Sequence, residues 1–277
     1  MPAPEAAQMQ QIARGKFMSF ALRVPTGWQD PAGEAGDTYR DAFKPEELNT
    51  APGSPPLYAP VTMNKYHTDT QKMLVAKTGA FIDGACSAIC SAWGQWQSTA
   101  SFAGIVVMGP VANIGVLVGP PLTPLIMASA PKASPMELAY SNAIAQAIGI
   151  GWLAFTLTVK FAATPLWPTF ALFPSPVVPP TPNSPIPFKT LVQVPVSISA
   201  DILKLAMVGM FAQPTAPFHQ QIFESIAFAF EQCYQVWSAS TQVTNVLGFG
   251  AVPTCLPPIM PPGPVIGTAL MAPGGLV

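Results

Sequence analysis

Charged residues are concentrated in the first third of this 277-residue chain. Residues 1–83 hold 17 of the 25 lysines, arginines, aspartates and glutamates, and none lies between Gly84 and Pro131 or between Gln232 and Val277. A free monomer stays soluble through a charged surface without large apolar patches. Residues 84–277, with eight charges, cannot easily provide one. Such a sequence fits a lipid bilayer, or a large assembly whose neighbouring subunits cover most of its surface.

The overall composition excludes several other classes of protein. Half of the residues are hydrophobic, so the chain has the material for a core and is not a disordered polar chain. A net charge of −1, with basic residues spread singly, does not support nucleic-acid binding. Four cysteines are too sparse for a disulfide framework. The N-terminus lacks an uninterrupted apolar stretch followed by a cleavage site, so we expect no signal peptide.

The 34 prolines determine where helices can form, because proline inside a helix costs about 3 kcal/mol or more. They leave four windows for long helices: 61–109, 136–164, 196–213 and 218–252. We therefore expect a mainly α protein, with three to four helices linked by long Pro/Gly-rich extended straps and little β structure. The expected parts are a polar N-terminal arm (1–60), a helix-plus-strap unit (61–135), a buried helix with a Pro-rich strap and a short strand (136–199), and a second helix-plus-strap unit with a C-terminal arm (200–277).

Two of the windows carry apolar stripes at helical spacing. The first stripe is Ile82, Cys86, Ile89, Trp93 and Trp96, and the second is Ile222, Ile226, Phe230, Cys233 and Trp237. Small residues surround the first stripe and favour close approach of another helix. A tight helix–helix seam and an ordinary core helix both explain it.

A third helix is expected to begin after Ser134. Ser134, Pro135 and Glu137 form a capping box with proline at the first helical position. The helix is expected to run to about Ala163, and residues 138–159 are uncharged and long enough to cross a membrane. Internal polar residues weaken that interpretation, and a helix buried in a protein assembly explains the segment equally well.

The proline-dense segments are expected to be extended or irregular chain lying on other protein, over most of residues 102–135 and 165–195. Residues 190–199 predict a short edge strand, with Val192, Val194, Val196 and Ile198 on one side. The uncharged C-terminal strap, 248–277, is expected to pack on a neighbouring subunit, and the chain's own helices are the alternative surface.

An offset of 141 residues superimposes parts of the two halves. Trp96 falls on Trp237, Gly109 on Gly250, and Pro120–Pro121 on Pro261–Pro262. The offset predicts an internal duplication in which Trp96 and Trp237 occupy matching places at the ends of two similar helices. Chance alignment of proline-rich tracts is the alternative.

Residues that could perform catalysis are few. No nucleophile elbow or phosphate-binding glycine loop occurs, and His67 and His219 are the only histidines. Cys86 and Cys90 lie four apart on one expected helix face, which favours small buried hydrophobes over redox or metal use. The acidic cluster of Asp37, Asp41, Glu46 and Glu47 is typical of a solvated or partner-facing segment. We expect no enzymatic activity, no cofactor and no metal.

The sequence therefore predicts a non-enzymatic structural subunit of a virion, a phage-tail-like particle or another large particle assembled in the cytoplasm. Its expected partners are copies of itself and other structural subunits, with no nucleic acid, and a membrane is the second choice. The expected interface residues are Trp93, Trp96, Phe230, Trp237, Pro261, Pro262, Val265 and Ile266. The alternative is a membrane-inserting or pore-forming protein, although four prolines within 102–128 oppose a spanning helix there. A module offering its straps to a proline-recognising groove ranks last, because the straps lack flanking basic residues.

Overall fold

The computed structural model describes residues 3–20, 55–213, 216, 218–255 and 260–277; within residues 55–72, and at 74, only the backbone is described. The chain divides into two units, residues 1–19 with 82–277, and residues 20–81. Helix α4 (Pro55–Thr99) contributes turns to both units, and the other described helices and strands belong to the first. The acidic cluster at 37–47 and the His67 side chain lie outside the described residues.

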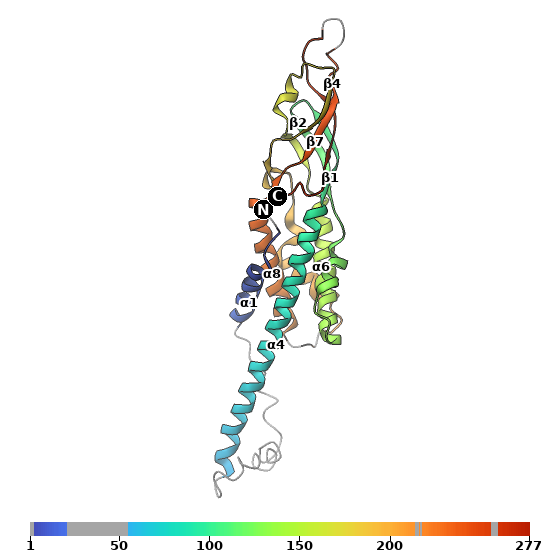
Figure 1. Cartoon of the computed structure of the whole chain (residues 1–277). Helices are drawn as coiled ribbons and strands as arrows, with labels where there is room; N and C mark the ends of the chain where they lie inside the picture. The colour runs from blue at the N-terminus through green and yellow to red at the C-terminus, as the bar shows by residue number, and fades with distance from the viewer. Residues whose placement is uncertain (1–2, 21–54, 214–215, 217, 256–259) are drawn as a thin grey trace. The chain divides into compact units, whose positions relative to one another are not determined.

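The first unit combines a curled antiparallel sheet with a group of helices (Figure 1). The sheet has six strands in the order β3-β2-β1-β8-β7-β4. Its strands are β1 (Ser101–Met108), β2 (Val111–Val118), β3 (Phe161–Pro165), β4 (Val177–Pro182), β7 (Val246–Ala251) and β8 (Ile266–Met271). A second, two-stranded sheet pairs β5 (Ile186–Pro187) with β6 (Gln242–Val243).

The remaining elements are helical. Besides α4, the α-helices are α1 (Ala6–Ser19), α5 (Leu122–Ser129), α6 (Pro135–Thr156), α7 (Ala200–Met210) and α8 (His219–Ser240). Short 3₁₀ turns are η3 (Pro168–Ala171), η4 (Phe188–Thr190) and η5 (Pro195–Ile198). In the described residues, six α-helices thus accompany eight strands, so the fold is mixed and the expectation of a mainly α protein with little β is wrong.

The largest correction concerns residues 102–135, most of which were expected to be extended or irregular chain in a protein with little β structure. They form the β1–β2 hairpin and then α5. Gly109 supplies the left-handed backbone of the hairpin turn, with φ of 59°, and Pro110 follows it where no ladder donor is needed. Pro124 lies in the first turn of α5, where its missing N–H has no partner to lose. No continuous helix crosses residues 110–124.

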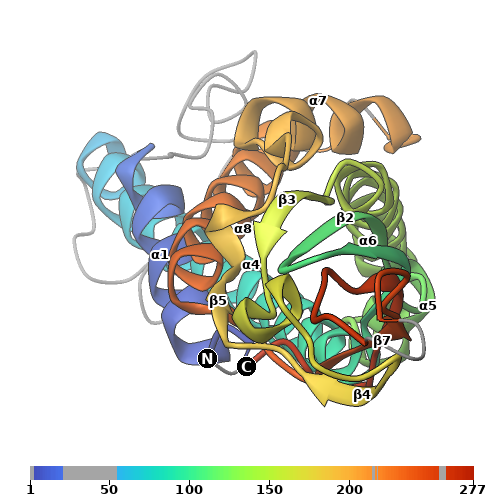
Figure 2. The same ribbon diagram turned by 90° about the horizontal axis from the view of Figure 1, so that it is seen from above.

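The inside of the curled sheet forms part of the hydrophobic core. Figure 2 shows the strands curving around the chain that follows β3. There Trp167 and Phe170 stack with ring centroids 5.4 Å apart, and both side chains are buried. Gly248 of β7 faces this pair, since a Cβ at Gly248 would lie 2.6 Å from the Trp167 ring. The sheet therefore closes tightly over two aromatic rings from its own crossover segment.

The expected strand over 190–199 is also wrong. Residues 195–198 form the 3₁₀ turn η5, and of the four stripe residues only Ile198 is buried. Val192, Val194 and Val196 are exposed. Part of the preceding strap, by contrast, joins the large sheet as its edge strand β4.

The helix predictions fared better. The Ser134 Oγ accepts a hydrogen bond from the Glu137 backbone N–H at 3.2 Å, and Pro135 is the first residue of α6, as predicted. The helix ends at Thr156, before the expected Ala163, because the chain turns there to enter β3. The two predicted apolar stripes, on α4 and α8, are confirmed as buried.

The 141-residue offset matches the end of helix α4 with that of α8, and residues 105–108 of β1 with residues 246–249 of β7. Helices α4 and α8 end at Thr99 and Ser240, 141 residues apart, and β1 and β7 both flank β8. The correspondence then fails, because Pro120–Pro121 precede helix α5 whereas Pro261–Pro262 precede strand β8. The expected repeat of a helix followed by a strap is therefore wrong for the two straps, which differ in secondary structure.

The C-terminal strap belongs largely to the chain's own fold. Strands β7 and β8 pair with each other, and β8 also pairs with β1. Val252, Val265 and Met271 are buried in the same chain, whereas Ile266 and Leu270 are exposed. Leu256 and Ile259 lie outside the described residues. The alternative of an intramolecular strap thus accounts for one face of this segment and leaves the other uncovered.

Candidate functional site

Four tryptophans from three helices meet in the centre of the helical layer. Trp152 of α6 lies 4.8 Å from both Trp93 and Trp96 of α4, and Trp237 of α8 lies 5.5 Å from Trp93, measured between ring centroids. All four side chains are at most 2% exposed. Edge-to-face aromatic pairs of this kind add stability beyond the area they bury.

Several residues expected at an interface are buried in or beside this cluster. Trp93, Trp96, Phe230 and Trp237 lie in the chain's own core, and Val265 is fully buried beneath the sheet. Pro261, Pro262 and Ile266 are exposed. The hydrophobic stripes that suggested an interface are therefore satisfied within one chain.

A single buried amide connects this core to the C-terminus. The Trp237 Nε1–H donates to Gln97 Oε1 at 3.0 Å, and Gln97 Nε2 donates to the Leu276 carbonyl at 2.9 Å. Gln97 is 6% exposed, so both hydrogen bonds are shielded from water. The amide satisfies two buried polar groups on segments far apart in the sequence.

Sulfur atoms gather under helix α1 without forming a reactive centre. Cys86, Cys90 and Cys233 are buried, and the Cys90 thiol lies 3.6 Å from the Met9 sulfur. Burial raises the pKa of Cys90 to about 12 and that of Cys233 to about 11, so both stay protonated near neutral pH. Within the described residues, no group of three or more histidines, cysteines or carboxylates could hold a metal ion.

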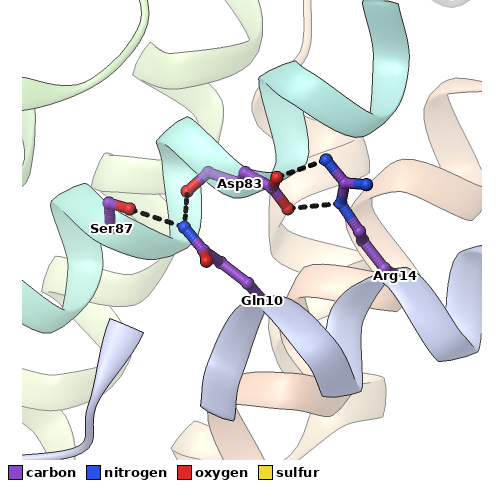
Figure 3. A network of polar contacts seen from close by, with 4 residues as sticks. All are labelled: Gln10, Arg14, Asp83 and Ser87. Atoms are coloured by element: carbon purple, nitrogen blue, oxygen red, sulfur yellow. Dashed lines mark hydrogen bonds and ion pairs between the residues drawn. The ribbon is translucent and has the colours of Figure 1, made fainter. Parts of the chain in front are cut away.

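Polar contacts attach α1 to α4 at the edge of this region (Figure 3). The Arg14 guanidinium forms a two-pronged ion pair with Asp83, in which Nε donates to Oδ1 at 2.6 Å. Gln10 Nε2 donates to the Ser87 hydroxyl at 2.8 Å and to the Asp83 carbonyl at 3.2 Å. Asp83 also raises the pKa of Arg14, chiefly through this hydrogen bond. The contacts lie near the surface and fix the position of α1; they form no catalytic arrangement.

A second ion-pair group joins α1, α7 and α8. Glu224 of α8 accepts contacts from Lys16 of α1 and Lys204 of α7. Hydrogen bonds from Lys204 and Lys16 lower the pKa of Glu224. His219 is the first residue of α8, and its Nδ1 lies 2.8 Å from the carbonyl oxygen of Ala216, just before the helix.

The outward face of the large sheet is apolar across five strands. One row of directly opposed residues runs through β2, β1, β8, β7 and β4, and consists of Val111, Met108, Ile266, Ala251 and Val177. Leu270 lies on the same face of β8, beyond the exposed Thr268. We call the five residues of the row and Leu270 the outer sheet face.

This face is solvent-exposed in the single chain and carries no charge. Met108, Ile266, Leu270 and Val177 are 55–64% exposed. The segments that build the sheet, 101–118, 161–188 and 242–277, contain no charged residue and no histidine. An ordinary antiparallel sheet turns polar side chains toward water on its outer face.

A second uncharged apolar surface lies where β2 meets α5 and α6. Val118, Ile150, Leu153 and Leu157, all 42–61% exposed, surround a hollow of about 210 Å³. We call it the α6 cleft. Trp96 and Trp152 line it and belong to the tryptophan cluster.

Close packing of α5 on α6 shapes this cleft. A Cβ at Gly149 would lie 2.0 Å from the Thr123 hydroxyl, so α6 requires glycine there. The two threonine hydroxyls in its lining, Thr123 and Thr156, donate to the carbonyls of Ala145 and Leu153. The cleft therefore offers mainly aliphatic and aromatic surface, and its lining includes Trp152, whose buried indole N–H has no hydrogen-bond partner.

Comparison of the chain with protein families, curated proteins and solved structures finds no match. Among the described residues, α6 is long and apolar enough to cross a membrane, but 61% of its most apolar window is buried inside the protein.

The sequence analysis predicted neither the outer sheet face nor the α6 cleft. The signal that could have found the first is a set of uncharged strand-length runs, such as 101–108 and 266–271, in which Ser101 and Thr268 are the only polar residues.

Proposed function

We propose that this chain is a non-enzymatic structural subunit of a large multi-protein assembly, such as a virion or a phage-tail-like particle. The observation that carries the proposal is the outer sheet face, a row of opposed apolar side chains with no charge in any strand around it. Each large side chain left in water forgoes roughly 1.5–3 kcal/mol of burial. A neighbouring subunit that covers the row recovers this free energy.

The polar chemistry of the described residues supports the non-enzymatic part of the proposal. The buried thiols are held protonated, and the ion pairs of Arg14 and Glu224 join helices. Catalytic sites usually gather titratable groups with matched pKa values in a cleft. The α6 cleft is lined instead mainly by apolar side chains and by two threonines whose hydroxyls donate to backbone carbonyls of α6.

A membrane-inserting protein is the second candidate, favoured by the apolar length of α6 and the uncharged sheet. Against it, lipid leaves no partner for backbone polar groups at open sheet edges or in irregular chain. The edge strands of the sheet are β3 and β4, and the partly exposed segment 192–198 is irregular chain and a short 3₁₀ turn, which do not span a bilayer.

Light scattering after gel filtration of the purified chain, without detergent, tests the proposal. A discrete oligomer or particle in aqueous buffer is the expected result. A monodisperse monomer would contradict it, and solubility that requires detergent or lipid would favour the membrane candidate instead.

A further inference from the structure

We propose that the outer sheet face of one copy of this chain docks onto the α6 cleft of a second copy. The inference rests on the proposed function and specifies which surfaces join neighbouring subunits. The contact is head-to-tail, because the two surfaces differ and are built from different elements.

The absence of charge on both surfaces argues for a second copy as the partner. A charged partner surface would lose its hydration on the outer sheet face and find no opposite charge there. The matching surface must therefore also be uncharged and apolar. The α6 cleft meets this condition, since neither it nor the outer sheet face contains a charged residue.

The α6 cleft has the size to receive one side chain of the outer sheet face. The sheet curls around its buried side, so its outer face is convex (Figure 2). Met108 and Leu270 lie on that face and are 57% and 61% exposed. The α6 cleft is a hollow of about 210 Å³ with an apolar rim. A cavity of about 150 Å³ can hold a benzene molecule, so the cleft has room for a leucine or methionine side chain.

Pairing between sheet edges is a poorer alternative. The edge strand β4 contains Pro179, Pro180 and Pro182, which have no backbone N–H to donate to an added strand. At the other edge, Ala163 of β3 has a left-handed backbone with φ of 50°, which interrupts a regular edge. The face of the sheet, not its rim, is left available for association.

Head-to-tail contacts have a consequence for assembly. Each copy keeps one unused surface after every contact, so growth continues until a ring closes or a filament forms. A self-complementary contact would stop at a dimer. The proposed pairing thus connects the two uncharged surfaces with the large assembly expected of the chain.

Complementation between two variants tests the proposal. Leu270→Glu places a charge on the outer sheet face, and Leu153→Glu places one on the rim of the cleft; both leucines are 61% exposed. Each variant alone is expected to stay folded and to self-associate about 100-fold more weakly than the wild type, because the carboxylate would be desolvated in the contact. Leu205→Glu, at a 70% exposed leucine on α7, is the matched control and is expected to assemble normally.

The decisive sample is an equimolar mixture of Leu270→Glu and Leu153→Glu. One intact face and one intact cleft remain in the mixture, so native mass spectrometry is expected to show a heterodimer and little larger material. A mixture that stays monomeric, or variants that assemble like the wild type, would overturn the proposal. Unaffected assembly would leave the proposed function standing, whereas a monomeric wild-type chain would overturn both.

Discussion

The buried amide of Gln97 offers a sharp test of how the core is held together. Its side chain accepts from the Trp237 indole and donates to the Leu276 carbonyl, joining α4, α8 and the C-terminus. The substitution Gln97→Leu keeps a similar volume and removes both hydrogen bonds. It leaves the indole N–H and the carbonyl, which belong to buried residues, without these two hydrogen-bond partners.

The expected loss follows from these two groups. A buried polar group without a partner costs about 1–3 kcal/mol, so two cost about 2–6 kcal/mol. Burying the added apolar atoms of leucine returns about 1–2 kcal/mol. We expect Gln97→Leu to lower the free energy of unfolding by about 1–4 kcal/mol.

Urea denaturation followed by tryptophan fluorescence measures this loss. Gln95→Leu, at an exposed glutamine two residues earlier on α4, is the control and is expected to change stability by less than about 0.5 kcal/mol. Trp237→Phe combined with Gln97→Leu should cost less than the sum of the single losses, because the orphaned donor is gone. Additive losses, or a Gln97→Leu protein as stable as the control, would refute this reasoning.

Three further predictions concern the thiols, the α1 ion pairs and the sheet. Cys90 and Cys233, whose pKa values burial raises to about 12 and 11, should not react with iodoacetamide at pH 8 until urea is added, and rapid native alkylation would contradict their burial. The lowered pKa of Glu224 stabilises the fold above the ordinary glutamate pKa of about 4.3, and this stabilisation is lost as the pH falls through the folded value. Glu224→Gln should therefore weaken the acid dependence of the melting temperature by an amount worth up to about 1 kcal/mol, and an unchanged profile between pH 6 and 3 would contradict it. Gly248→Ala should destabilise the chain by about 1–3 kcal/mol in thermal unfolding, because its methyl group overlaps the Trp167 ring, whereas Gly209→Ala, in open space on α7, should be neutral or stabilising.

The helices could be predicted from the sequence because their signals are local. The capping box at Ser134 and the stripes ending at Trp96 and Trp237 depend on spacing within one element, and each lies where it was expected. The large sheet was missed for a physical reason. A strand with one solvated face alternates apolar and polar residues, whereas 105–108 are apolar throughout and 266–271 have Thr268 as their only polar residue, so both lack that period.

The candidate surfaces could not be predicted from the sequence because they depend on contacts between distant segments. Trp93 and Trp237 were expected at an interface because large aromatics need cover, but three helices of the same chain provide it. The outer sheet face depends on the register between β1, β8, β7 and β4, which are far apart in sequence. Such pairings have no local sequence pattern, so the sequence does not indicate that Met108 and Val177 lie in one row.

The oxidation rate of Met108 tests most directly whether protein covers the outer sheet face. Met108 is 57% exposed in the single chain, and Met73 and Met18, 70% and 62% exposed, lie outside both proposed contact surfaces. Purified wild-type chain in detergent-free buffer is treated with dilute hydrogen peroxide, and peptide mass spectrometry follows sulfoxide formation at each methionine. We predict that Met108 is protected relative to Met73 and Met18, and that Leu153→Glu removes the protection. Equal oxidation of the three methionines in the wild-type protein would contradict the claim that a neighbouring subunit covers this face.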